Sequence, residues 1–251
     1  GLLSFTPQKH LYISVSRGTF KCYVGESLQP FTDAISGDIL KFTGTEETIE
    51  LTPPGDDTAR DLSNEVVRIE PDRSVENAFV MIGTNRSNLR SYRGKMRLVL
   101  EGKTLLAINE LPLEEYLLGV VPAEMDPEWP EEALKAQAVA SRSYAIFNLK
   151  RYDGRGFDLA DDERSQEYGG VDVETDASAN AVMETTNQIL TYENRLAVIV
   201  FHEESGGQTA SNLDVWPHSG EIPYLAGVSD VIGFTDFSSG GRYDSWSSWA
   251  G

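Results

Sequence analysis

Hydrophobic and polar residues alternate in short runs through the first part of the chain, which predicts β-strands. Runs rich in β-branched and aromatic residues lie at 11–15, 20–24, 39–42, 66–69 and 78–82, separated by Gly, Pro, Asn and Asp. Residues 52–58 contain two consecutive prolines and a glycine, so we expect a loop there. Residues 95–100 and 104–108 flank a Glu-Gly-Lys turn and predict a hairpin.

The pattern changes from residue 109 onward. Residues 113–119 predict a short helix, and the three prolines within 120–130 predict irregular structure. Residues 131–150 contain strong helix formers and neither glycine nor proline, so we expect one long helix. Pro130 suits the first helical position, and Glu131 and Glu132 suit the positive end of the helix dipole.

The remaining chain mixes loops, one helix and a hairpin. We expect a loop at 152–170, then a helix at 177–186 with Asp176 as its N-cap. Residues 188–192 and 196–201 predict a hairpin that leads into His202 and a glycine-containing loop. Together these elements predict an α+β fold. The long helix would pack on a mostly antiparallel sheet that includes 188–202, with a β-rich N-terminal region.

Composition and charge exclude several classes of partner. The 251 residues carry 21 Lys and Arg against 40 Asp and Glu, a net charge of −19. That balance argues against nucleic-acid and anionic-lipid partners, and favours a neutral or positively charged one. A single cysteine, Cys22, excludes an intrachain disulfide. No apolar run approaches the ~20 residues of a membrane span. The first and last residues suggest a processed start and a natural chain that continues beyond residue 251.

Several common catalytic motifs are missing. The chain has no Gly-x-Ser-x-Gly pentad, which argues against an α/β-hydrolase. His202-Glu203 begins like a His-Glu-x-x-His zinc site, but Gly206 stands at the second histidine position. No phosphate-binding loop of the Gly-x-x-x-x-Gly-Lys type occurs.

One carboxyl lies in an unusual setting. Glu124 is bounded by prolines and apolar residues, and desolvation there would raise its pKa toward the range of a general acid. Lys135 and Arg142 lie seven residues apart on one face of the predicted long helix, with the small Ala138 between them. The alternative interpretation is that Glu124 caps the helix or is simply exposed, and that both cations are solvated surface charges.

Longer sequence blocks carry a family resemblance. Residues 109–125 read NELPLEEYLLGVVPAEM, and residues 129–145 read WPEEALKAQAVASRSYA. Shorter pieces are Tyr92-Arg-Gly94, Gln166-Glu-Tyr-Gly-Gly170 and the stretches 201–209, 214–216 and 223–225. These blocks resemble the SpoIID/LytB family, the sporulation protein IID and amidase enhancers of bacterial cell-wall turnover. The resemblance divides the chain into a β-rich region, 1–91, of uncertain role and a SpoIID/LytB-like catalytic domain, 92–251.

The resemblance implies roles for particular residues. The family's catalytic glutamate falls on Glu124. Residues implicated in activity or glycan contact fall on Lys135 and Arg142, and further candidates for substrate binding are Tyr168, His202, Ser205 and Thr209. For the last three, a loop-stabilising hydrogen bond is an alternative. Tyr144 and Tyr168 could stack on sugar faces, with a core role as the alternative for Tyr144.

The chain departs from the family pattern at one loop. Many members hold zinc there with two cysteines and a histidine, but Ala160, Arg164 and Ser165 stand at those positions. We therefore expect no metal and no cofactor. Another interaction must stabilise the loop, and an ion pair between Arg164 and the acids at 161–163 is a candidate.

The implied function is a peptidoglycan lytic transglycosylase that acts outside the cytoplasm, in the wall, periplasm or intermembrane space. Its substrate would be peptidoglycan glycan strands, cleaved between N-acetylmuramic acid and N-acetylglucosamine to 1,6-anhydro ends. A non-catalytic enhancer of an N-acetylmuramoyl-L-alanine amidase is the alternative from another class. A third possibility is an inverting hydrolase that pairs Glu124 with an acid from 161–163.

Overall fold

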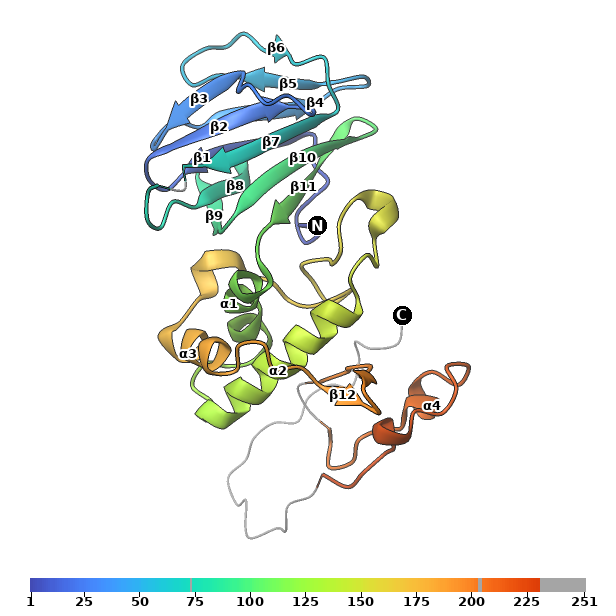
Figure 1. Cartoon of the computed structure of the whole chain (residues 1–251). Helices are drawn as coiled ribbons and strands as arrows, with labels where there is room; N and C mark the ends of the chain where they lie inside the picture. The colour runs from blue at the N-terminus through green and yellow to red at the C-terminus, as the bar shows by residue number, and fades with distance from the viewer. Residues whose placement is uncertain (73, 203–204, 231–251) are drawn as a thin grey trace. The chain divides into compact units, whose positions relative to one another are not determined.

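The computed structural model describes residues 1–72, 74–202 and 205–230 (Figure 1). The chain forms two compact units, Gly1–Phe201 and a second that begins at His202.

Two antiparallel sheets form the N-terminal half of the first unit. One has the order β6 (Arg60–Asp61), β5 (Ile49–Thr52), β4 (Leu40–Gly44), β1 (His10–Val15), β8 (Val80–Asn85) and β9 (Asn88–Tyr92). The other has the order β11 (Thr104–Glu110), β10 (Lys95–Glu101), β7 (Val66–Pro71), β2 (Thr19–Val24) and β3 (Thr32–Ile35). The predicted β-rich region and its hairpin at 95–108 are confirmed.

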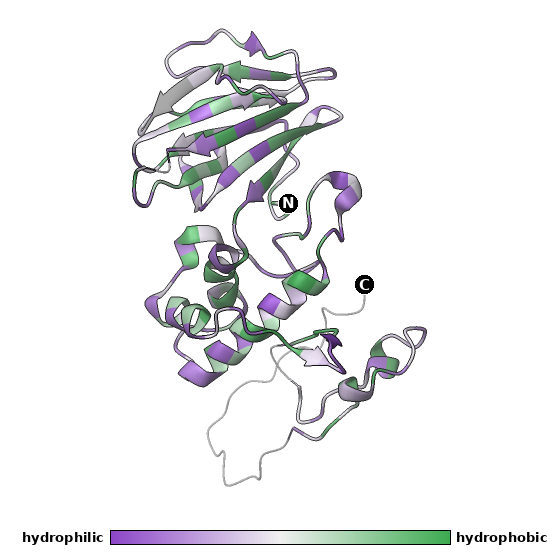
Figure 2. Ribbon diagram, in the orientation of Figure 1, coloured by the Kyte–Doolittle hydropathy of each residue, from purple (hydrophilic) through white to green (hydrophobic). Residues whose placement is uncertain are grey.

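The sheets pack face to face around one core. Alternate residues of each strand point inward, so Leu11 and Ile13 of β1 share a buried cluster with Phe20 and Cys22 of β2. Figure 2 shows the corresponding alternation of hydrophobic and hydrophilic residues along the strands. Burial of these inner faces supplies the main driving force for folding of the sandwich.

Three helices follow the sandwich and pack on one another: α1 (Leu113–Glu124), α2 (Glu131–Phe147) and α3 (Asp176–Glu184). The prediction that residues 120–124 are irregular was wrong, because α1 continues through Pro122 to Glu124. A proline inside a helix removes one hydrogen bond and crowds the carbonyl four residues earlier, at a cost of about 3 kcal/mol. Val120 and Val121 are fully buried, and this packing outweighs that cost.

Other boundaries differ from the sequence prediction by a few residues. The long helix ends at Phe147, and α3 begins at Asp176 with Thr175, rather than Asp176, as its N-cap. Thr175 and Ser178 form a reciprocal capping box, a pattern that outcompetes a single aspartate cap.

The α+β class is confirmed, but the long helix does not pack on a sheet that includes residues 188–202. Helix α2 packs on α1 and α3. The predicted hairpin forms, but its strands β12 (Thr191–Tyr192) and β13 (Arg195–Leu196) are short and pair only with each other. Residues 188–202 therefore add no strand to a larger sheet in the described part of the chain.

Short elements complete the described chain. The 3-10 helices η1 (Asp153–Arg155) and η2 (Gly170–Val173) lie in the first unit. The second contains α4 (Asn212–Val215) and η3 (Pro223–Leu225). Within the residues that the structure describes, every helix is too short or too polar to cross a membrane.

Candidate active site

Glu124 is the last residue of α1 and is half-buried. Its Oε1 accepts a hydrogen bond of 2.8 Å from the backbone N–H of Glu167. Burial raises the pKa of the Glu124 carboxyl above its usual value, the Glu167 N–H lowers it, and the nearby charge of Glu167 raises it again. The net direction is upward, so this carboxyl keeps its proton to a higher pH than an exposed glutamate does.

The loop that supplies Glu167 is fastened to the sandwich by Asp161. The buried Asp161 carboxylate accepts hydrogen bonds from the backbone N–H of Ser4 at 2.8 Å and from its hydroxyl at 2.5 Å. The carbonyl of Asp161 accepts the N–H of Tyr168 at 3.2 Å. The N-terminal segment therefore holds the loop on one side while Glu124 contacts it on the other.

Polar contacts also close the loop on itself. The Arg164 guanidinium pairs with the Asp162 carboxylate, and the Ser165 hydroxyl accepts the backbone N–H of Ala160 at 3.1 Å. Residues 160, 164 and 165 are the positions where the resemblance places zinc ligands. In this chain a hydrogen bond joins Ala160 to Ser165, and an ion pair joins Arg164 to Asp162.

Tyr168 lies in the core rather than on a surface that could bind a sugar. It is 6% exposed, and its ring lies 5.0 Å from that of Tyr116 and 5.8 Å from that of Tyr92. Its hydroxyl donates to Asn109 Oδ1 at 2.7 Å, while Asn109 Nδ2 donates to the carbonyls of Arg93 and Lys95. Tyr168 thus joins the loop to the end of β11 and the strands beside it.

Gly119 explains how the loop approaches α1 so closely. The N–H of Gly169 donates to the carbonyl of Gly119 at 3.0 Å. A Cβ at position 119 would lie 2.7 Å from the Tyr168 ring and 2.8 Å from the carbonyl oxygen of Gly170. A glycine within a helix costs about 1 kcal/mol relative to alanine. Here it permits the contact that brings Glu167 to Glu124.

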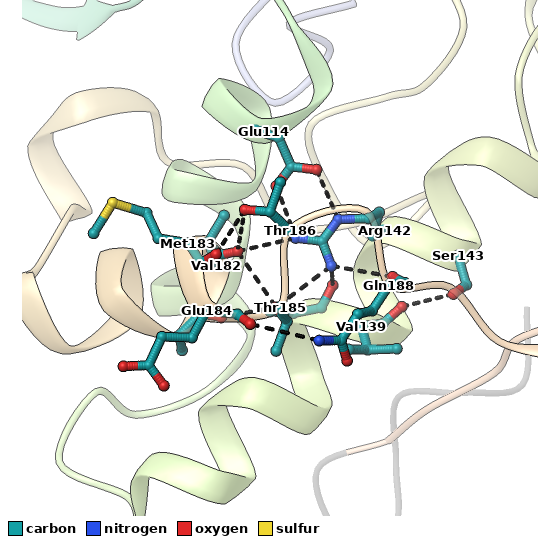
Figure 3. A network of polar contacts seen from close by, with 12 residues as sticks. Glu114, Val139, Arg142, Ser143, Val182, Met183, Glu184, Thr185, Thr186 and Gln188 are labelled. Atoms are coloured by element: carbon teal, nitrogen blue, oxygen red, sulfur yellow. Dashed lines mark hydrogen bonds and ion pairs between the residues drawn. The ribbon is translucent and has the colours of Figure 1, made fainter.

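Arg142 is buried among backbone oxygens and one carboxylate (Figure 3). It is 1% exposed, and its Nε and Nη2 donate to the two carboxylate oxygens of Glu114 at 2.8 and 2.7 Å. Nη2 also donates to the carbonyl of Val182, and Nη1 donates to that of Gln188, each at 3.2 Å. This placement leaves Arg142 no surface for a glycan. It holds α1, α2 and the residues around the end of α3 together.

Lys135 lies on α2 and contacts three carboxylates. Its Nζ lies 2.5 Å from Glu131, 3.1 Å from Glu132 and 2.6 Å from Glu184. These hydrogen bonds raise the pKa of the Lys135 ammonium further above neutrality. The side chain is 20% exposed and its partners are largely exposed, so Lys135 is accessible at the surface where α2 meets α3.

His202, Ser205 and Thr209 belong to the second unit. The Ser205 hydroxyl donates to Asp230 at 2.6 Å and accepts the N–H of Gly207. The Thr209 hydroxyl accepts the N–H of Val228 at 2.9 Å. Ser205 and Thr209 thus have the loop-stabilising contacts expected of such residues. Their role in substrate binding, and that of His202, stays a prediction.

A cavity of about 450 Å³ lies between the end of β11, the start of α1 and residues 156–161. Asn109, Tyr116 and Tyr168 line it, but Glu124 does not. We therefore place no substrate in this cavity.

Sequence reasoning missed Glu167 and the partners of the two cations. Glu167 contacts Glu124 across 43 positions of sequence, and Arg142 contacts Glu114 across 28. No local periodicity joins residues so far apart. The available signal was that Glu167 stands within the Gln166-Glu-Tyr-Gly-Gly170 block, one of the blocks on which the resemblance depends.

The site is therefore that of a protein with one desolvated glutamate at a helix end, supported by a buried arginine and an acidic loop. Residues 101–192 match the family model SpoIID, described as Stage II sporulation protein. An uncharacterized protein of Brachyspira hyodysenteriae is 37% identical over 138 residues, which cover 55% of this chain and 37% of the relative.

Two further relatives carry informative names. The amidase enhancer of Bacillus subtilis is 35% identical over 123 residues, covering 47% of this chain and 16% of the relative. The stage II sporulation protein D of Bacillus amyloliquefaciens is 34% identical over 137 residues, covering 49% and 39%. The chain thus spans less than two fifths of each relative's length. Residues 101–192 are thus similar to the SpoIID model, and the names of two relatives agree with the resemblance to the SpoIID/LytB family, which is confirmed.

Proposed function

We propose that this chain acts on peptidoglycan outside the cytoplasm, as a lytic transglycosylase with Glu124 as its acid and base. The observation that carries the proposal is the Glu124 carboxyl, which is half-buried at a helix end and has a raised pKa. A raised pKa increases the protonated fraction of such a group at a given pH, and after donating its proton the group can act as a base. Family membership and the names of the relatives support a role in the cell wall.

The reaction needs one proton donor that later accepts a proton. Glu124 would protonate the oxygen that joins N-acetylmuramic acid to N-acetylglucosamine, and the bond from that oxygen to the muramoyl C1 breaks. The Glu124 carboxylate then takes the proton of the muramoyl C6 hydroxyl, whose oxygen attacks C1 and forms the 1,6-anhydro ring. Because the nucleophile belongs to the substrate, no water is consumed and a second catalytic carboxylate is not required.

The surrounding residues divide into two groups in this proposal. Lys135, His202, Ser205 and Thr209 would contact glycan oxygens, with Lys135 supplying an ammonium near the start of α2. Arg142 and Tyr168 would act indirectly, because both are buried and engaged by protein groups. We propose that residues 92–251 form the catalytic part of the chain and that peptidoglycan glycan strands are its partner.

Mass spectrometry of digested glycan strands tests this proposal. Purified strands, with and without peptide stems, are incubated with the protein, and the new ends are identified. The proposal predicts 1,6-anhydromuramoyl ends, which are one water lighter than reducing ends. Reducing ends would instead indicate a hydrolase, and no new ends would exclude cleavage by this chain under those conditions.

The amidase enhancer among the relatives favours a second candidate function. The chain would then bind the wall and stimulate an N-acetylmuramoyl-L-alanine amidase without cleaving glycan. Release of stem peptides by such an amidase, measured with and without this chain, tests that function. Stimulation that persists with Glu124→Gln would show that it does not need the acid.

A further inference from the structure

Glu167 contributes more to the site than the backbone hydrogen bond described above. Its N–H lies 2.8 Å from Glu124 Oε1, so the two residues are in direct contact. The short glutamate side chain cannot carry its carboxyl more than roughly 10 Å from that of Glu124. The negative charge of Glu167 is therefore close enough to act on the Glu124 carboxyl.

The backbone on either side fixes the direction of the Glu167 side chain. Gln166 is 1% exposed and Tyr168 is 6% exposed, whereas Glu167 between them is exposed. In extended chain, alternate side chains point to opposite sides, so Glu167 faces solvent because its neighbours face the core. The Tyr168 contacts with Asp161 and Asn109 hold this arrangement in place.

The neighbouring charges leave the Glu167 carboxylate without an opposing partner. In its own loop, Arg164 pairs with Asp162, and Asp161 is engaged by Ser4. The remaining acid of that loop, Glu163, adds negative charge. Among the described residues Glu167 forms no ion pair.

The helices packed against the site present phenols and cations. Tyr116 of α1 and Tyr144 of α2 are near enough to sense the charge of Glu124. Both phenols are neutral at physiological pH, and burial raises the pKa of each further. The cations of α2, Lys135 and Arg142, are engaged by other carboxylates. Among the described residues, the charge that acts on the pKa of Glu124 is that of Glu167.

We propose that Glu167 is a positioning residue for the acid, which uses its negative charge to keep the proton on Glu124 until a glycan is bound. The inference rests on the proposed function, because it assigns Glu124 as the group that gives up that proton. Burial raises the pKa of Glu167 as well, and the negative charges of Glu163, Asp162 and Asp161 raise it further. Two like charges at this separation disfavour ionisation of both carboxyls.

The test is Glu167→Gln, which removes the charge but keeps the backbone N–H. Glu163→Gln is the matched control, because it removes one exposed charge from the same loop farther from Glu124. The titration of the Glu124 carboxyl is followed by carbon NMR of the intact chain. We expect Glu167→Gln to lower its midpoint by about 0.5–1 pH unit and Glu163→Gln to lower it by less than half as much.

The pH profile of cleavage gives a second readout. Activity that needs protonated Glu124 falls as pH rises through its pKa, so the alkaline limb should move to lower pH in Glu167→Gln. An unchanged Glu124 titration in that variant, or an equal shift in Glu163→Gln, would overturn the inference. The titration does not depend on cleavage. A wild-type chain that makes no anhydro ends therefore refutes the proposed function separately.

Discussion

At the scale of single residues, the site depends on what surrounds one carboxyl. Among the described residues Glu124 forms no ion pair, and the α2 cations Lys135 and Arg142 are both held by other acids. Desolvation is the largest influence on its pKa, and the Glu167 N–H limits the rise by hydrogen bonding to the charged form. Desolvation thus favours the protonated form of Glu124 relative to an exposed glutamate, while its side chain stays partly exposed.

The raised pKa of Glu124 predicts a pH-dependent cost to folding. Between the ordinary glutamate pKa and the raised one, the folded state binds more protons than the unfolded state, so stability falls as pH rises through that window. Glu124→Gln removes this dependence. We expect the difference in unfolding free energy between the variant and wild type to grow in favour of the variant as pH rises from about 4 to about 8.

Urea unfolding of both proteins across that pH range measures the difference. The contributions of all other titrating groups cancel in the comparison. A difference in unfolding free energy that does not change with pH would show that Glu124 titrates at its ordinary value.

At the scale of elements, two contacts hold α1 in place. One is the ion pair of Arg142, and the other is the close approach of a loop at Gly119. Arg142 joins α1 to α2 and to residues around the end of α3, and Gly119 lets the 168–170 segment approach it. Both contacts hold the helix that ends at Glu124, one in its first turn at Glu114 and one in its middle at Gly119.

Arg142→Met tests the first contact. The variant keeps most of the apolar side chain but removes every donor from a 1% exposed site, which leaves Glu114 and several carbonyls unpaired. Because Glu114 is 36% exposed, the main cost comes from the carbonyls that lose a donor, and we expect a loss of about 2–3 kcal/mol of unfolding free energy. Lys135→Met is the control, because its ion pairs with exposed carboxylates contribute little to stability. Equal losses in the two variants would contradict the structural role of Arg142.

Gly119→Ala tests the second contact. The added methyl would collide with the Tyr168 ring and with the backbone oxygen of Gly170, which cannot rotate away. Alanine also favours the helix, so we expect a net loss of about 1–2 kcal/mol in thermal or urea unfolding. The same shift of the loop should reduce glycan cleavage. Gly154→Ala is the control, since nothing lies within 4 Å of its Cβ position. A more stable Gly119→Ala would show that the loop does not need this approach.

At the scale of the whole molecule, the sequence predicted the regular parts well. The hairpin of β10 and β11 follows from two hydrophobic runs around Gly102, and α2 follows from helix formers without glycine or proline. These features depend on local propensity. The end of α1 could not be predicted in this way, because tertiary burial of Val120 and Val121 overrides the effect of Pro122.

The candidate site was predicted only in part, for a related reason. The setting of Glu124 is partly local, since apolar residues flank it in sequence. The burial of Arg142 depends on Glu114, Val182 and Gln188, which lie 28 to 46 residues away. A charged residue on a helix is usually solvated. Only the fold identifies the carboxylate and the carbonyls that surround Arg142.

The net charge of −19 predicts a salt-dependent stability of the whole chain. Repulsion among like charges destabilises the compact state, and added salt screens it over a shorter distance. We expect the melting temperature to rise by a few degrees between roughly 10 and 300 mM NaCl, where the screening length falls from about 30 to about 6 Å. Replacing the exposed Glu26, Glu76 and Glu128 with Gln should reduce this slope. A melting temperature that falls as salt is added would contradict the prediction that charge repulsion destabilises the chain.

The most direct test of the central claim is glycan cleavage by Glu124→Gln, the closest isostere that cannot transfer a proton. Cleavage is measured as the rate of appearance of anhydro ends, and binding as sedimentation with insoluble peptidoglycan. Glu128→Gln, an exposed change four residues away, is the matched control. We predict a loss of cleavage on the order of 10²–10⁴-fold or more with binding retained, and no loss in the control. Undiminished cleavage by Glu124→Gln would mean that another residue is the acid.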